Sequence, residues 1–140
     1  MKTRGITIQA VVLCGALVVQ YALGMYVNLF VSFPDNFNEG QLWEFAWSQP
    51  LLAAHIVLAI LILVGAIVLC VRVWRAGVRA WVWPSLIGLL GVLLAGTGGA
   101  QFIPSQIDGY SYMMSLGFLI AFAAYCWGLY CAAKITSQVA

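Results

Sequence analysis

Residues 50–71 read PLLAAHIVLAILILVGAIVLCV, an apolar run without a charged side chain. An α-helix needs about 20 consecutive apolar residues to cross the hydrocarbon core of a bilayer, and this run meets that length. Three further uncharged runs follow the same pattern, at about 6–33, 81–103 and 110–133. The sequence therefore predicts an all-α membrane protein in which residues 1–140 form one domain of four transmembrane helices. Because the connections are short, we expect an up-down-up-down bundle.

The composition of the chain excludes the soluble classes of protein. Of its 140 residues, 64% are hydrophobic and only 7% are charged, whereas about a quarter of the residues of a soluble domain are charged. A surface with so few charges would not stay soluble in water. The net charge is only +2, which offers no basic surface to a nucleic acid. The lipid bilayer is therefore the expected partner, and a nucleic acid is not.

The charged side chains are divided by sign between the two sides of the predicted bundle. The lysines and arginines flank the N-terminus, the second connection and the C-terminus: Lys2, Arg4, Arg72, Arg75, Arg79 and Lys134. The carboxylates fall in the first and third connections: Asp35, Glu39, Glu44 and Asp108. Because Lys and Arg mark the cytoplasmic side of a membrane protein, we expect both termini in the cytoplasm.

The first connection contains a short aromatic segment at about residues 41–47, QLWEFAW. Trp43 and Trp47 are one helical turn apart, and tryptophan is enriched where membrane meets water. The segment is therefore predicted to be a helix that lies in the membrane interface. It is interpreted first as an anchor for the connection, and alternatively as a lid over a site that opens on the outer side.

Each predicted span carries a stripe of small or polar residues at helical spacing. Such stripes pack helices together inside lipid, where apolarity alone does not drive their association. The small residues of the third and fourth spans are Gly88, Gly91, Ala95, Gly98, Gly99, Gly117, Ala121, Ala124 and Gly128. In the second span His55 lies on the small stripe, so we expect its side chain to point into the bundle.

The polar residues of the spans gather at one depth, and polar residues within a membrane are functional candidates. At 1.5 Å per residue they lie within roughly 10 Å of the outer membrane boundary. The candidate binding residues of this layer are His55, Asn28, Met25, Met113, Met114 and Gln101. The sequence contains no Ser-His-Asp arrangement and no zinc-type ligand spacing, so it predicts neither a catalytic group nor a metal site.

His55 is the only histidine of the chain, and four roles are open to it. It can be a neutral side chain that fixes helix packing through a hydrogen bond to Asn28, Gln101 or a backbone carbonyl. It can be an axial ligand of a haem b, with a methionine opposite. It can also donate a hydrogen bond to the carbonyl of a quinone, or bind Cu(I) together with methionines.

Two other classes of small membrane protein are disfavoured. Every carboxylate lies in a connection, so the spans hold no acidic proton carrier of the kind that small multidrug exporters use. None of the four cysteines belongs to a C-x-x-C pair, and all four fall in the predicted cytoplasmic half. This placement argues against the membrane thiol oxidoreductases.

Three short motifs resemble a known group of proteins. They are GMYVNLFVSFP at residues 24–34, Ala54-His55 in the second span, and GAQF at residues 99–102. Together they are similar to a group of small four-span bacterial membrane proteins, many of them actinobacterial. In that group the first span ends in N-L-(F/Y)-V-x-(I/F)-P, a lone histidine begins the second, and N-G-A-x-F closes the third. This chain has Gly98 where the group has asparagine, which removes a polar partner near His55.

The resemblance implies that Asn28 and His55 are a paired feature and that the protein lies in a bacterial cytoplasmic membrane. It implies no activity. We therefore expect a non-catalytic protein that serves as an accessory or small-molecule-binding subunit of a larger membrane complex, such as a respiratory one. The expected protein partners are other membrane subunits or further copies of the chain. One alternative is electron transfer with a haem or quinone at His55, and another is a small oligomeric transporter.

Overall fold

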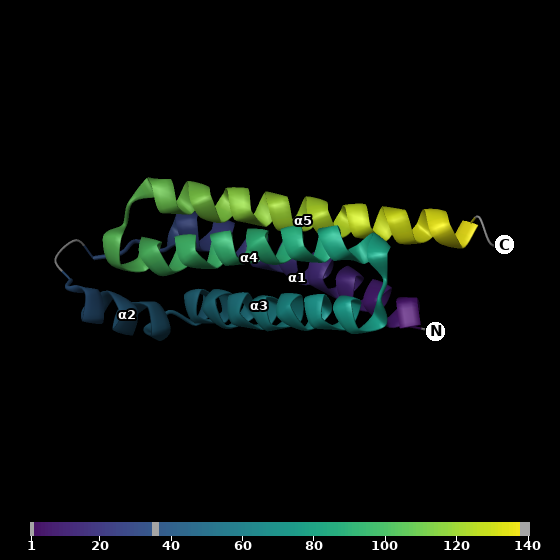
Figure 1. Ribbon diagram of the computed structural model, residues 1–140. Coiled ribbons are helices and arrows are strands. Elements are labelled where there is room, and N and C mark those ends of the chain that lie inside the picture. Colours follow the sequence, from purple (N-terminus) through teal and green to yellow (C-terminus); the bar gives the residue numbers. More distant parts are fainter. Residues whose placement is uncertain (1, 35–36, 138–140) are drawn as a thin grey trace.

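The computed structural model describes residues 2–34 and 37–137. In this part of the chain there are five α-helices and no strand (Figure 1). The helices are α1 (Lys2–Phe30), α2 (Glu39–Ser48), α3 (Pro50–Ala76), α4 (Arg79–Ser105) and α5 (Asp108–Ser137). All except α2 are long and apolar enough to cross a membrane. The prediction of an all-α protein with four such helices is confirmed.

Two of the helix ends differ from the predicted limits for local reasons. The helix α1 ends at Phe30 rather than at residue 33, because Pro34 has no backbone N–H and disfavours helical geometry in the residue before it. The helix α3 continues past residue 71 to Ala76, where Gly77 ends it with a φ of 66°. This left-handed geometry suits glycine, and the Gly77 N–H bonds the Trp74 carbonyl as in a usual helix C-cap.

The third span was predicted to end at residue 103, which would place Pro104 just beyond it, and this limit was wrong. The helix α4 runs through both Pro84 and Pro104 and ends at Ser105. A proline in the last turn removes only one helical hydrogen bond, and Gln106 offsets this loss. Its backbone N–H donates to the Phe102 carbonyl (2.8 Å), and its side-chain Nε2 donates to the Ile103 carbonyl (2.6 Å).

The short helix α2 is longer than the predicted segment 41–47, because a capping box starts it. The Gln41 N–H donates to Asn38 Oδ1 (3.0 Å), and the Asn38 N–H donates to Gln41 Oε1 (2.9 Å). These two bonds give acceptors to two backbone N–H groups at the helix start that have no partner within the helix. On its other face α2 buries Leu42 and Ala46 against the ends of the long helices.

The long helices contact one another in a ring: α1 packs on α3, α3 on α4, α4 on α5, and α5 on α1. Figure 1 shows the start of α1, the end of α5 and the α3–α4 connection at one end of the molecule, and α2 at the other. We call these the opposite end and the α2 end. Near the opposite end, Arg72 donates to Gln9 Oε1 (2.7 Å) and Gln9 Nε2 donates to the Gly65 carbonyl (2.9 Å). This polar chain ties α1 to α3.

The helices α4 and α5 approach closely because glycines face each other along them. A Cβ atom on Gly117 would lie 2.5 Å from the Ala95 nitrogen and 2.6 Å from the Gly91 carbonyl oxygen. A Cβ atom on Gly91 would lie 2.6 Å from the Ala121 nitrogen. No side chain fits between these backbones. The small stripes predicted for the third and fourth spans therefore meet each other.

Large aromatic side chains fill the bundle toward the opposite end. Trp81 and Tyr125 are fully buried, and each lies over a glycine of the neighbouring helix: Trp81 over Gly128, and Tyr125 over Gly88. Aliphatic side chains of α1 and α3 complete this core. These side chains fill the interior between the helices in this half of the molecule.

We predict that Gly117→Ala destabilises the protein by about 1–3 kcal/mol, because the added methyl group must push α4 away from α5. The matched control is Gly96→Ala on α4, where a Cβ atom meets nothing within 4 Å. That control should be neutral, or stabilising by up to about 1 kcal/mol through helix propensity. Unfolding by SDS in mixed micelles, followed by circular dichroism, measures both. Equal stability of the two variants would contradict the close α4–α5 contact.

Candidate functional site

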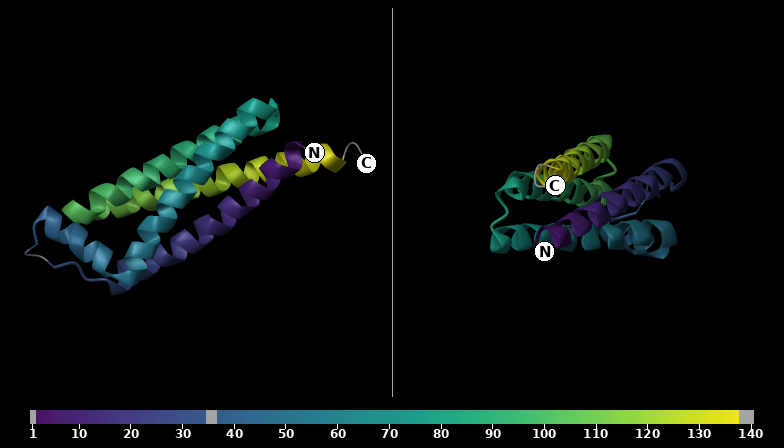
Figure 2. Two further views of the ribbon diagram at one scale, coloured as in Figure 1. Left: turned by 90° about the horizontal axis from the view of Figure 1, so that it is seen from below. Right: turned by 90° about the vertical axis from the view of Figure 1, so that its right-hand side faces the viewer.

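A cavity of about 1060 Å³ lies between the helices in the half of the molecule near α2. All five helices contribute to its walls. In the left view of Figure 2, the ribbons of α1 and α5 overlap at the end that carries N and C and lie apart toward the α2 end. The floor of the cavity is formed by buried side chains of the core: Leu17, Ile62, Val92 and Ala121. Its volume is that of a site for a small organic molecule.

His55 enters the cavity wall from the first turns of α3, and two residues of α1 position its ring. Gln20 Nε2 lies 3.2 Å from His55 Nε2. Gly24, one turn further along α1, leaves room for the ring, since a Cβ atom there would lie 3.0 Å from His55 Cε1. The expected partners Asn28 and Gln101 were wrong, because the side chain in hydrogen-bond contact with His55 is Gln20.

The orientation of the Gln20 amide is linked to the tautomer of His55. An amide nitrogen can only donate, so in this orientation of the amide His55 Nε2 accepts and the hydrogen of the neutral ring is on Nδ1. His55 Nδ1 and Gln20 Oε1 are both buried and have no hydrogen-bond partner among the described residues. A buried polar atom without a partner costs roughly 1–3 kcal/mol. Both atoms are enclosed within the wall, so they carry this cost without being open to a molecule in the cavity.

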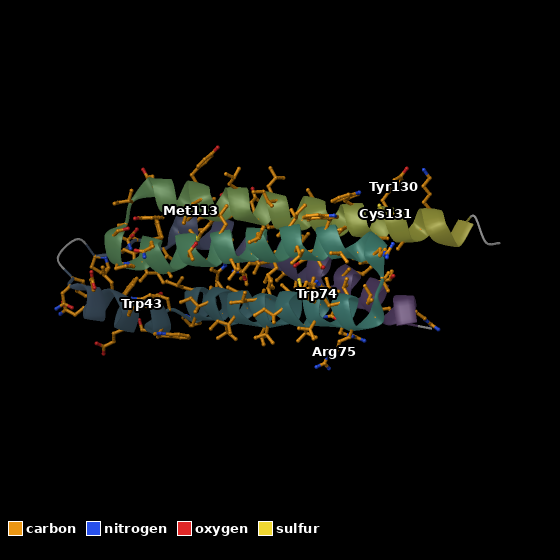
Figure 3. All side chains as sticks on the ribbon, viewed as in Figure 1. Trp43, Trp74, Arg75, Met113, Tyr130 and Cys131 are labelled. Atoms are coloured by element: carbon orange, nitrogen blue, oxygen red, sulfur yellow. The ribbon has the colours of Figure 1, made fainter. Side chains whose placement is uncertain are left out.

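The structure brings together four of the six predicted binding residues. His55, Asn28, Met25 and Met114 line the cavity. Met113 and Gln101 are not part of its lining; Gln101 is exposed, and Met113 is half-buried. Figure 3 shows Met113 on the part of α5 near the α2 end. Neighbouring residues of a helix point about 100° apart, so Met113 and Met114 cannot both face the same space.

Gln20 is the residue that the sequence-based set missed. It lies one turn before Gly24 and two turns before Asn28 on the same stripe of α1, and this spacing is the signal that could have included it. Gln20 lines the cavity together with the candidates. Three hydroxyl side chains of the wall bond carbonyls of their own helices. Ser115 Oγ donates to the Ser111 carbonyl (3.2 Å), Thr97 Oγ1 to the Leu93 carbonyl (3.0 Å), and Ser105 Oγ to the Gln101 carbonyl (2.6 Å).

Aromatic rings form much of the wall and the mouth of the cavity. Tyr21 of α1 stacks on Phe118 of α5 with ring centroids 4.9 Å apart. At the mouth Phe33 makes edge-on contacts with Phe45 of α2 (5.5 Å) and Phe102 of α4 (6.0 Å). Trp43 and Trp47 also line the cavity, and Figure 3 shows Trp43 on α2 at this end of the molecule. The helix α2 therefore forms part of the cavity wall, through these aromatic side chains.

The walls carry almost no charge. The lining contains one histidine, His55, and one carboxylate, Asp108, and it contains no Lys or Arg. The described residues contain no group of three or more His, Cys, Asp or Glu side chains that could hold a metal ion. The four cysteines all lie outside the lining. An uncharged organic molecule suits these walls better than an anion or a metal ion.

We predict a measurable coupling between His55 and Gln20. His55→Leu should cost about 0.6–2 kcal/mol if the hydrogen bond holds α1 to α3. In a double-mutant cycle of His55→Leu with Gln20→Leu, the two losses should be non-additive, with a coupling of roughly 0.6–1.7 kcal/mol. Unfolding by SDS in mixed micelles supplies all four stabilities. Strict additivity would show that the two side chains do not interact.

Comparison with known proteins adds no relative to this picture. No protein family, no curated protein and no solved structure matches the chain. The candidate site is therefore assigned from its own geometry: a cavity at the α2 end, apolar and aromatic walls, and one uncharged polar pair.

Proposed function

We propose that this chain is a four-helix bundle of a bacterial cytoplasmic membrane that binds an uncharged, hydrophobic small molecule in the outer half of the bilayer. In this proposal it is not an enzyme but an accessory, ligand-binding subunit of a larger membrane assembly. The observation that carries the proposal is the cavity of about 1060 Å³ with His55 and Gln20 in its wall.

The distribution of charge supports the proposed orientation. The described cationic side chains belong to the opposite end: Arg4, Arg72, Arg75, Arg79 and Lys134. Figure 3 shows Arg75 and the neighbouring Trp74 toward this end. The described carboxylates, Glu39, Glu44 and Asp108, belong to α2 and to the start of α5; Asp35 lies outside the described residues. The positive-inside rule then puts both termini in the cytoplasm and the cavity in the outer half.

The walls of the cavity support binding of a small molecule. Sites of this kind are concave, mostly apolar and aromatic, and carry a few polar groups that orient the ligand. The cavity has aromatic side chains from α1, α2, α4 and α5, and its buried polar pair comes from α1 and α3. A ligand would therefore contact every helix of the bundle.

The small size of the connections supports the role of a subunit. Only Gly77 and Val78 separate α3 from α4, and only Gln106 and Ile107 separate α4 from α5. The protein therefore meets its surroundings mainly through its long apolar helices, which contact lipid and can contact other membrane proteins. Purification in mild detergent as a monomer, with no partner, would contradict this part of the proposal.

The alternative of a haem protein has less support. Axial ligation uses a ring nitrogen, and Gln20 already occupies His55 Nε2. Since the chain has a single histidine, the second ligand would have to be Met25 or Met114 in the cavity wall. An absorption spectrum of the purified protein decides this point. A Soret band that disappears in His55→Ala would replace the proposal with the haem alternative.

We predict that Ala59→Phe reduces ligand binding at least tenfold, because Ala59 lines the cavity one turn from His55 and a phenyl ring there fills it. The matched control is Ala123→Phe, at an exposed position of α5 outside the cavity lining. Binding of the neutral fluorophore N-phenyl-1-naphthylamine to protein in nanodiscs is measured by energy transfer from tryptophan, with empty nanodiscs subtracted.

Wild type and Ala123→Phe should show saturable binding of this fluorophore, and Ala59→Phe should not. Two results would contradict the proposal: no saturable binding to wild type, or equal binding to all three proteins.

A further inference from the structure

Another, smaller hollow lies on the surface of the molecule near the opposite end, between α3 and α4. Its volume is about 310 Å³. The residues that line it belong to the last turns of α3 and to α4: Cys70, Val71, Trp74, Arg75 and Leu86. None of them lines the cavity beside His55, so this hollow is independent of the proposed ligand site.

The lining of this hollow changes from charged to apolar with depth in the bundle. Trp74 and Arg75 lie in the last turn of α3, next to the α3–α4 connection. At 1.5 Å per residue, Val71 and Cys70 lie about 5–8 Å deeper along α3, and Leu86 lies about 10 Å from the start of α4. A phospholipid has the same order, because its charged head group lies at the membrane interface and its acyl chains lie below it.

The guanidinium group of Arg75 has no partner in the part of the chain that the structure describes. It makes no hydrogen bond and no ion pair there, whereas Arg72, three residues earlier on α3, donates to Gln9 Oε1 at 2.7 Å. A guanidinium group carries its N–H donors in a planar fork that matches the oxygens of a phosphate group. Arg75 is therefore available to bind a phosphate at the edge of the hollow.

The charges around the hollow favour an anionic head group. Arg79 begins α4 four residues after Arg75, and the first turn of α4 contains no acidic side chain. The described carboxylates, Glu39, Glu44 and Asp108, belong to α2 and to the start of α5 at the α2 end. An anionic phospholipid is therefore attracted to this place, whereas a zwitterionic lipid also brings a cationic group that the arginines repel.

The start of α4 adds backbone donors to this positive charge. Val78 is the N-cap of α4 and gives no side-chain cap, so N–H groups of the first turn are open to an anion. Two carbonyls at the end of α3 are already bonded: the Gly77 N–H donates to the Trp74 carbonyl (3.2 Å), and the Val78 N–H to the Val73 carbonyl (3.4 Å). The open N–H groups of α4 therefore supplement the arginines.

We infer that the protein binds one anionic phospholipid, of the phosphatidylglycerol type, at the α3–α4 connection. The lipid phosphate accepts hydrogen bonds from Arg75, with Arg79 close by, and one acyl chain begins in the hollow between Val71 and Leu86. Trp74, which is 71% exposed, lies beside the head group, as is usual for tryptophan at a membrane interface. In the proposed orientation this lipid belongs to the cytoplasmic leaflet.

Native mass spectrometry of the protein in mild detergent tests this inference by titration with two lipids. Dioleoylphosphatidylglycerol and dioleoylphosphatidylcholine have the same acyl chains and differ only in the head group. One cationic side chain near an anionic lipid changes the affinity about fivefold. The first molecule of phosphatidylglycerol should therefore bind wild type at least about fivefold more tightly than the first molecule of phosphatidylcholine.

Two pairs of variants locate the site. Arg75→Gln should lower the affinity for phosphatidylglycerol about fivefold, and Arg4→Gln, which removes the same charge from the start of α1, should leave it unchanged. Val71→Trp fills the hollow and should also weaken binding of this lipid. Val64→Trp, at an exposed position two turns earlier on α3 and outside the hollow, should not.

Equal affinity of wild type for the two lipids overturns the inference, and this comparison decides the preference even if a variant does not fold. An equal loss in Arg75→Gln and Arg4→Gln also overturns it, because the attraction would then depend on net charge alone. Unchanged binding by Val71→Trp overturns the role given to the hollow. None of these results affects the proposed function, which concerns the cavity beside His55 and is tested by binding of the fluorophore.

Discussion

The close backbone contact between α4 and α5 is the constraint on which the rest of the structure depends. Lipid chains are as apolar as the helices, so helix association in a membrane relies on close packing. Gly91 and Gly117 provide this packing, because a Cβ atom on either would meet the backbone of the other helix. The pair α4–α5 is thereby a unit, and α1 and α3 complete the ring around its remaining surface.

Two other glycines of the α4–α5 pair explain how one half of the bundle is filled. Toward the opposite end, Gly88 and Gly128 make room for Tyr125 and Trp81, and these large side chains occupy the space between the helices. Toward the α2 end the cavity remains between the helices. Its polar pair, His55 with Gln20, ties α1 to α3 in this half. Structure and proposed ligand binding thus depend on the same two side chains.

The sequence was sufficient for the helices because their signals are local. Uncharged apolar runs define the four long helices, and the glycine stripes of the third and fourth spans identify the faces that meet. The helix ends were less predictable. Pro104 stays within α4 because the side chain of Gln106 caps the Ile103 carbonyl, and a proline alone gives no sign of such a cap.

The sequence was sufficient to predict the depth of the site within the membrane, but not the residues that contact each other there. Gln20, Asn28 and Gln101 are all amides within or near the outer half of the spans, and only the rotation of each helix decides which one meets His55. That rotation follows from packing between helices distant in sequence, such as the fit of the His55 ring against Gly24. The same uncertainty separates Met114, which lines the cavity, from Met113, which does not.

The most direct test of the central claim is native mass spectrometry of the protein released in mild detergent from its own membrane. We expect a species that carries one small, lipid-soluble molecule in wild type and in Ala123→Phe, and a species without it in Ala59→Phe. A protein that carries no such molecule in any form, or the same molecule in all three, would contradict the claim that the cavity beside His55 is a ligand site.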